Sequence, residues 1–196
     1  KMMLKLSEIR NKHYSHQRGK LINMDADIDD WKYSPYTYLK ARVYIELSSL
    51  LVFVLQFTRI SPNQVTLIYS FCGLLGGIFL TINNNTSIII ACLIFYFKGV
   101  LDWTDGLLAR IRNETSSFGH ILDAWGSNVG YIFFIGGLSI YCFNITNNTI
   151  YIIILICFLI IKALDFKNYL YQQSFYEILN NTKNIENNFQ KKDEVI

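Results

Sequence analysis

Charged residues are scarce in this chain, since Asp, Glu, Lys and Arg make up only 17% of its 196 residues, against roughly 25% in soluble globular domains. Hydrophobic residues make up 52%, and the mean hydropathy is +0.24. The apolar residues are gathered into long blocks, which excludes one large soluble core. The composition therefore predicts an all-α integral membrane protein.

A strong charge of one sign is also missing. The formal net charge is only +3, and most of the excess lies at the N-terminus and at the ends of apolar blocks. This modest excess gives no support to a nucleic-acid partner. We expect the lipid bilayer, with its anionic headgroups, to be the partner of these cations.

Paired cysteines are absent as well. The four cysteines lie inside or at the edge of apolar blocks without CxxC spacing, at Cys72, Cys92, Cys142 and Cys157. This pattern favours neither a zinc site nor a disulfide framework. We expect small buried hydrophobic residues at these positions.

The first 41 residues form a polar segment in which no apolar core of a signal peptide is visible. The acidic patch DADIDD at residues 25–30 is interpreted as a solvated linker in preference to a metal site. The next apolar block, residues 44–58, is shorter than the roughly 20 residues that cross hydrocarbon, and it contains Glu46. We therefore predict an interfacial amphipathic helix at residues 42–60.

Longer apolar blocks follow. We predict about four transmembrane spans, at residues 64–82, 87–108, 118–143 and 150–164. They form a transmembrane domain at 61–164, which a polar C-terminal tail at 165–196 follows. Four spans place every basic segment on one side of the membrane, which the preference of Lys and Arg for cytoplasmic loops predicts to be the cytoplasm.

Acidic residues interrupt two of these spans on their helical faces. Asp102, Asp105, Gly106 and Ala109 share one face by spacing, and Gly119, Asp123 and Ser127 share another. Packed together, the two faces would bring three carboxylates into one pocket. Clustered like charges at membrane depth repel one another unless a cation lies among them, and oxygen ligands suit magnesium, manganese or calcium.

A simpler interpretation stays open for the first two acids. Asp102 and Asp105 would then lie in water at a helix end, paired with Arg110 or Arg112. A small transporter or channel that uses the acids as an ion path is a second alternative. The gathering of the acids at one side of the membrane argues against an ion path.

The stretch from Asp102 to Ser127 resembles the signature of the CDP-alcohol phosphotransferase family, D-x2-D-G-x2-A-R-x8-G-x3-D-x3-D, and matches every fixed position except the last. Residues 61–66, SPNQVT, resemble the P-N-x-x-T segment that precedes the first span in many members. The resemblance covers about residues 35–165.

The resemblance implies a transferase of phospholipid biosynthesis. Such an enzyme moves a phosphatidyl-type group from a CDP-linked donor, such as CDP-diacylglycerol, to an alcohol such as inositol phosphate or glycerol phosphate, and releases CMP. It implies Mg²⁺ or Mn²⁺ as cofactor, with a two-metal site, and a homodimer. It assigns Asp102, Asp105 and Asp123 as metal ligands, and it places around the nucleotide and diphosphate Gly106, Ala109, Arg110, Gly119, Asn63 and Thr66.

Ser127 occupies the position of the family's fourth acid, to which the role of general base is assigned. A serine hydroxyl does not ionise near neutral pH and cannot be that base without help. Three explanations are open: a deliberate replacement that inactivates the enzyme, a natural enzyme with another base, or a protein that binds a CDP-lipid or a divalent cation without catalysis.

The number of spans also departs from the family, whose members usually have six. A partial chain, a tail that lies on the membrane surface, or a partner that completes the pocket would each account for the difference. The acceptor alcohol is not determined by these motifs.

Overall fold

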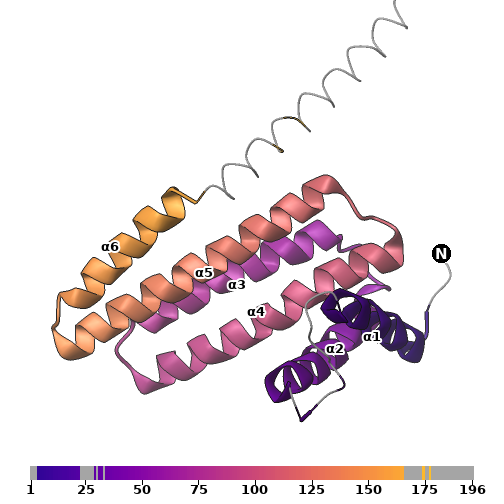
Figure 1. Cartoon of the computed structure of the whole chain (residues 1–196), viewed down its shortest axis with the longest axis horizontal. Coiled ribbons are helices and arrows are strands. Elements are labelled where there is room, and N and C mark those ends of the chain that lie inside the picture. Colours follow the sequence, from indigo (N-terminus) through magenta and orange to yellow (C-terminus); the bar gives the residue numbers. More distant parts are fainter. Residues whose placement is uncertain are drawn as a thin grey trace, which may run out of the picture.

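The computed structural model describes residues 4–22, 29, 31–32, 34–165, 174 and 177. Within them the chain forms six helices and no strand, which confirms the all-α prediction (Figure 1). Most of the predicted acidic linker and nearly all of the predicted C-terminal tail lie outside the described residues. The helices are α1 (Leu6–Ile22), α2 (Pro35–Leu55), α3 (Pro62–Thr81), α4 (Asn85–Arg112), α5 (Ser117–Thr146) and α6 (Ile150–Ala163).

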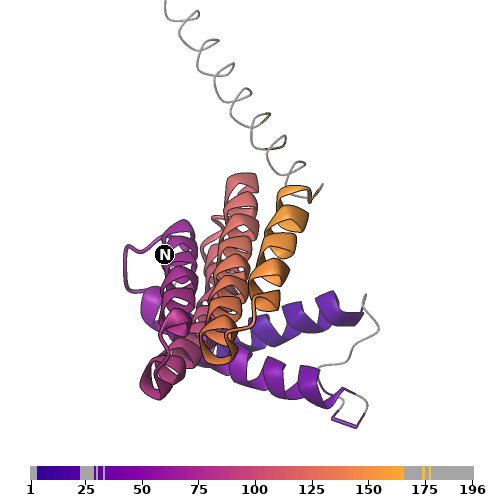
Figure 2. The same cartoon turned by 90° about the vertical axis from the view of Figure 1, so that its left-hand side faces the viewer.

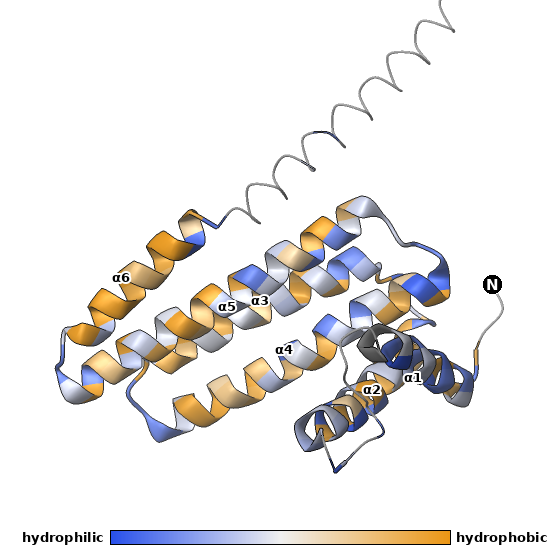
Figure 3. Cartoon of the chain, viewed as in Figure 1, coloured by the Kyte–Doolittle hydropathy of each residue, from blue (hydrophilic) through white to orange (hydrophobic). Residues whose placement is uncertain are grey.

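Three of the helices are long and apolar enough to cross a membrane, namely α3, α4 and α5 with 20, 28 and 30 residues. They correspond to the first three predicted spans. The fourth predicted span corresponds to α6, an apolar helix of 14 residues that rises only about 21 Å, less than the roughly 30 Å hydrocarbon core. Figure 3 shows the apolar character of α6 and the hydrophilic character of α1.

Helix α3 is the centre of the bundle, because it packs against both α4 and α5. Helix α6 packs on the outer side of α5, and α2 joins α1 to α4 (Figures 1 and 2). The start of α3, the end of α4 and the start of α5 lie at the same end of the bundle, beside α1 and α2. This end carries Asp105 and Asp123, which belong to the motif.

Local sequence explains where these helices begin and end. Ser61 accepts a hydrogen bond from the backbone N–H of Gln64, whose side chain in turn accepts one from the Ser61 N–H, and Pro62 follows at the first helical position. Asn113 adopts a left-handed conformation with φ 57° and ends α4. Ser116 then accepts from the Gly119 N–H and starts α5.

Glycines allow α3 and α5 to approach closely. A Cβ atom added at Gly73 would lie 2.6 Å from the Cα of Gly130, and one at Gly77 would meet the backbone of Phe133. Such contacts leave no room for a side chain, which is how small residues let membrane helices pack. The middle parts of α3 and α5 therefore pack backbone against backbone.

The N-terminal half of the chain differs from its predicted outline. Residues 42–60 were predicted as one interfacial helix, whereas α2 begins at Pro35 and ends at Leu55. Inside the polar N-terminal segment, α1 packs on α2 through His13, which is fully buried. The His13 ring lies 5.7 Å from that of Trp103, which stacks in turn on Tyr44 at 5.6 Å.

Candidate active site

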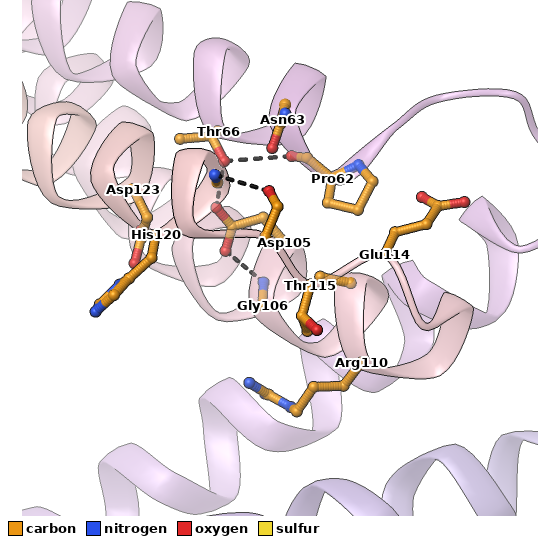
Figure 4. A pocket seen from close by; sticks show the side chains of 13 residues that line it. Pro62, Asn63, Thr66, Asp105, Gly106, Arg110, Glu114, Thr115, His120 and Asp123 are labelled. Atoms are coloured by element: carbon orange, nitrogen blue, oxygen red, sulfur yellow. Dashed lines mark hydrogen bonds between the residues drawn. The ribbon is translucent and has the colours of Figure 1, made fainter. Parts of the chain in front are cut away.

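A cavity of about 250 Å³ opens between the start of α3, the end of α4 and the start of α5 (Figure 4). Eight of the ten site residues predicted from the sequence line it: Asn63, Thr66, Asp105, Gly106, Ala109, Arg110, Gly119 and Asp123. The other two, Asp102 and Ser127, are not among the lining residues. The two motif halves, which lie on different helices, thus meet at one cavity.

Asp105 is the most buried of the acids, with 4% of its surface exposed. One carboxylate oxygen accepts a hydrogen bond from the Thr66 hydroxyl at 2.5 Å, and the other accepts from the Gly106 N–H at 2.6 Å. Thr66 comes from α3, so this contact ties the P-N-x-x-T segment to the acidic helix. Both partners are neutral donors, and the carboxylate keeps accepting capacity toward the cavity.

Asp123 is held by α3 in a similar way. The hydroxyl of Tyr69 lies 2.6 Å from the Asp123 carboxylate and 2.7 Å from its backbone carbonyl oxygen. Tyr69 is fully buried, and the absence of a side chain at Gly126 leaves room for its ring, since a Cβ there would lie 2.9 Å from it. The position of Asp123 is therefore set by the packing of α3 against α5.

Asp102 and Ser127 lie beside each other. The Ser127 hydroxyl donates a 3.0 Å hydrogen bond to the Asp102 carboxylate. This contact joins α4 to α5 one turn deeper in the bundle than Asp105 and Asp123. In this structure Ser127 therefore acts as a hydrogen-bond donor to a carboxylate.

The two arginines of the motif region have different surroundings. Arg110 lines the cavity, whereas Arg112 donates to the carbonyl oxygens of Leu55, Ile60 and Thr58 at 2.7, 2.6 and 3.0 Å. Among the described residues, neither Asp102 nor Asp105 forms an ion pair with either arginine. The structure thus differs from the alternative of a water-exposed ion pair at the helix end.

The donor atoms fit a hard divalent cation, because the acids offer carboxylate oxygens and their neighbours offer hydroxyls. Asp105 and Asp123 both face the cavity. Within the part of the chain that the structure describes, no three His, Cys, Asp or Glu side chains already gather closely enough to hold a metal. Two carboxylates with substrate phosphates are, however, a common way to bind magnesium.

Sequence reasoning missed several residues here. The cavity wall also contains Pro62, Glu114, Thr115, Ser116 and His120, and Tyr69 supports Asp123 from behind. Helical spacing contained a signal for Tyr69, which follows Thr66 by three residues on the same face of α3. No comparable signal existed for Glu114 or Thr115, which reach the wall through the turn between α4 and α5.

These features define an integral membrane protein with an acid-lined cavity at one end of a helical bundle. The family model of CDP-alcohol phosphatidyltransferases matches residues 59–173, more than half of the chain, and the chain belongs to this family. No curated protein matches the chain. The family transfers phosphatidyl groups from CDP-alcohols to alcohol acceptors in phospholipid synthesis, and its members generally depend on a divalent metal.

Proposed function

We propose that this chain transfers a phosphatidyl-type group from a CDP-linked donor such as CDP-diacylglycerol to an alcohol acceptor and releases CMP. One observation carries the proposal: Asp105 and Asp123, from the two halves of the family motif, line the same cavity together with Arg110. A cavity that presents carboxylates and an arginine at the end of a membrane bundle suits a diphosphate that is attached to a lipid.

The donor's nucleotide and diphosphate are proposed to occupy this cavity. Gly106 and Gly119 keep its walls open, since a Cβ at Gly119 would lie 3.1 Å from Asn63 Oδ1 and from Ser116 Oγ. The Arg110 guanidinium would bind phosphate oxygens, for which its fork of donors is well matched. The apolar outer faces of α3, α4 and α5 would leave the acyl chains of the donor in the bilayer.

Asp105 and Asp123 would hold the divalent ion, with Asp102 next to them. When bound, this ion neutralises the diphosphate and stabilises the charge that builds on departing CMP. Thr66 and Tyr69 orient the two carboxylates through their hydroxyl groups. Hydrogen bonds of this kind, made to the residues that bind the metal, commonly set both the geometry and the affinity of a metal site.

In the transfer, the acceptor oxygen forms a bond to the lipid-bearing phosphorus, and the bond from that phosphorus to the bridging oxygen of CMP breaks. The acceptor's hydroxyl proton must pass to a base. Ser127 is not that base, because its hydroxyl donates to Asp102 and does not ionise near neutral pH. This arrangement also favours a second candidate, a protein that binds the CDP-lipid without turning it over.

The cavity is proposed to open to the cytoplasm. The end of α4 that borders it carries Arg110 and Arg112, and the basic helix α1 lies at the same end of the bundle (Figure 1). Lys and Arg prefer the cytoplasmic side of a membrane. Thiol labelling of Glu114→Cys, in a variant without the four native cysteines, from each side of sealed vesicles in turn would test this orientation.

The test of the function is Mg²⁺- or Mn²⁺-dependent release of CMP from CDP-diacylglycerol with a panel of alcohols. It compares the unaltered chain with Ser127→Asp and, as a control, with Asp105→Asn. Turnover that Asp105→Asn abolishes supports the transferase. Binding of CDP-diacylglycerol by the unaltered chain, with turnover only in Ser127→Asp, supports the binding protein. Binding that Asp105→Asn leaves unchanged contradicts the site.

A further inference from the structure

Lys98 is a cation deep in the bundle for which the family motif has no position. It lies on α4 one turn before Asp102, on the same helical face. It precedes the end of α4 at Arg112 by 14 residues, which corresponds to about 21 Å along the helix. An ionisable side chain at such a depth is costly and is usually retained for a function.

The two neighbouring helices leave room for this side chain. A Cβ at Gly73 of α3 would lie 3.4 Å from Lys98 Cε, and a Cβ at Gly130 of α5 would overlap the same carbon. The lysine therefore passes through the interface of α3, α4 and α5, where each neighbouring helix has a glycine. Any larger residue at Gly130 would displace it.

The ammonium ends among the groups that hold the acids. Lys98 Nζ lies 4.7 Å from the centre of the Tyr69 ring, and the Tyr69 hydroxyl donates to Asp123. Lys98 also interacts electrostatically with Asp102, whose carboxylate accepts a hydrogen bond from Ser127. One positive charge thus acts on the acid that does not line the cavity.

The charges around the site are consistent with a single divalent ion. The cavity and its deeper neighbours hold four carboxylates (Asp102, Asp105, Glu114 and Asp123) and two cations (Lys98 and Arg110). Together they leave two negative charges, which one divalent cation neutralises. The same residues with one more carboxylate at position 127 and no lysine would leave four negative charges, which match two divalent cations.

We propose that Lys98 is a fixed cation that takes the place of a second metal ion, so that this chain binds one divalent ion at Asp105 and Asp123. The inference rests on the proposed function and revises the two-metal expectation derived from the family resemblance. Magnesium held by one or two carboxylates and completed by water and phosphate oxygens is common in proteins.

The experiment counts Mn²⁺ ions bound per chain by electron paramagnetic resonance, with the purified full chain in nanodiscs. It compares the unaltered chain with Lys98→Met, with the double variant Lys98→Met/Ser127→Asp, and with Lys162→Met. Lys162 is a matched control, because its ammonium also lies over a ring, 5.4 Å from the centre of Tyr131, but on α6. Helical content and size-exclusion profiles establish that each variant is folded.

We expect one Mn²⁺ per chain in the unaltered protein and in Lys162→Met, and two in the double variant. Lys98→Met alone is expected to bind its single ion about tenfold more tightly, because a neighbouring cation has been removed. This single substitution keeps the inference testable if the double variant does not fold.

Two outcomes overturn the inference and leave the proposed function standing. The first is the binding of two Mn²⁺ ions by the unaltered chain. The second is an ion count and an affinity that neither Lys98→Met nor the double variant changes. A third outcome overturns both: an unaltered chain that binds no Mn²⁺ and releases no CMP.

Discussion

The hydroxyl of Tyr69 donates a 2.6 Å hydrogen bond to the carboxylate of Asp123. Tyr69 belongs to α3 and Asp123 to α5, so the contact crosses the closest helix interface of the bundle. A fully buried tyrosine needs a partner for its hydroxyl, and here that partner is an acid of the family motif. The packing of the bundle and the geometry of the site are therefore linked through one side chain.

Replacing Tyr69 by Phe removes this donor while keeping the ring. We expect a roughly 10- to 100-fold weaker Mn²⁺ affinity, the usual effect of losing an outer contact of a metal ligand, with the fold retained. Mn²⁺ titration measures the change. Tyr96→Phe is the matched control, since Tyr96 is exposed and lies on α4 instead of α3. An equal loss of affinity in both variants would contradict a specific role for Tyr69.

Thr66 allows a second test on the other wall of the cavity. Thr66→Val keeps the shape of the side chain but removes the hydroxyl that donates to Asp105 at 2.5 Å. We expect about a tenfold loss in Mn²⁺ affinity or more, and Thr66→Ser should restore most of it. If valine and serine behave alike in a Mn²⁺ titration, the hydroxyl does not position Asp105.

His13 should make the protein sensitive to acid. Burial, together with the charges of Arg110 and His16, lowers the pKa of His13 from 6.5 to about 4, against a smaller opposing effect of a backbone hydrogen bond to Ile45. Because the folded-state pKa is depressed, the unfolded chain takes up this proton first as the pH falls. The stability that neutral His13 contributes is complete above pH 6.5, and about 3 kcal/mol is lost by about pH 4.

The measurement is thermal unfolding between pH 7 and pH 4 for the unaltered chain and for His13→Gln. Carboxylates also titrate in this range, so only the difference between the two proteins reports on His13. We expect the unaltered chain to lose more stability on acidification than the variant does. Parallel curves would show that His13 is not the acid-sensitive group.

Arg112 should stabilise the connection between α2 and α3. Its guanidinium donates to three backbone carbonyl oxygens at this connection, and hydrogen bonds to charged groups contribute about 1.5–3 kcal/mol each. Because such bonds are not additive, we expect Arg112→Ala to cost about 2–4 kcal/mol. Arg59→Ala, at an exposed position of the same connection, should change the melting temperature little; equal effects would contradict the assignment.

Much of the fold could be predicted because it is encoded locally. Blocks of apolar residues separated by Asn-rich or polar turns mark α3, α4 and α5 within a few residues of their ends, and Ser61 caps α3 as its sequence signature indicates. The existence of α1 could not be predicted, since its polar sequence has no strong apolar stripe. Its stability comes from contacts with α2, among them the 3.1 Å hydrogen bond between His13 and Ser48.

The candidate site shows the same division. Spacing along α4 and α5 places Asp105 and Asp123 on definite faces, and both line the cavity. Spacing did not reveal that Asp102 lies outside the lining, with Ser127 as its hydrogen-bond partner. The depth of each residue along the bundle decides this, and depth depends on how the helices are shifted against one another.

The sequence by itself determined an all-helical membrane protein with two acidic helix faces, because helical periodicity and apolar length are properties of a single segment. Only the tertiary structure decided that Thr66 meets Asp105, that Tyr69 meets Asp123, and that Lys98 passes two glycines to the Tyr69 ring. These contacts join different helices. They depend on the rotation and axial shift of one helix against another, which close packing at a few small residues sets.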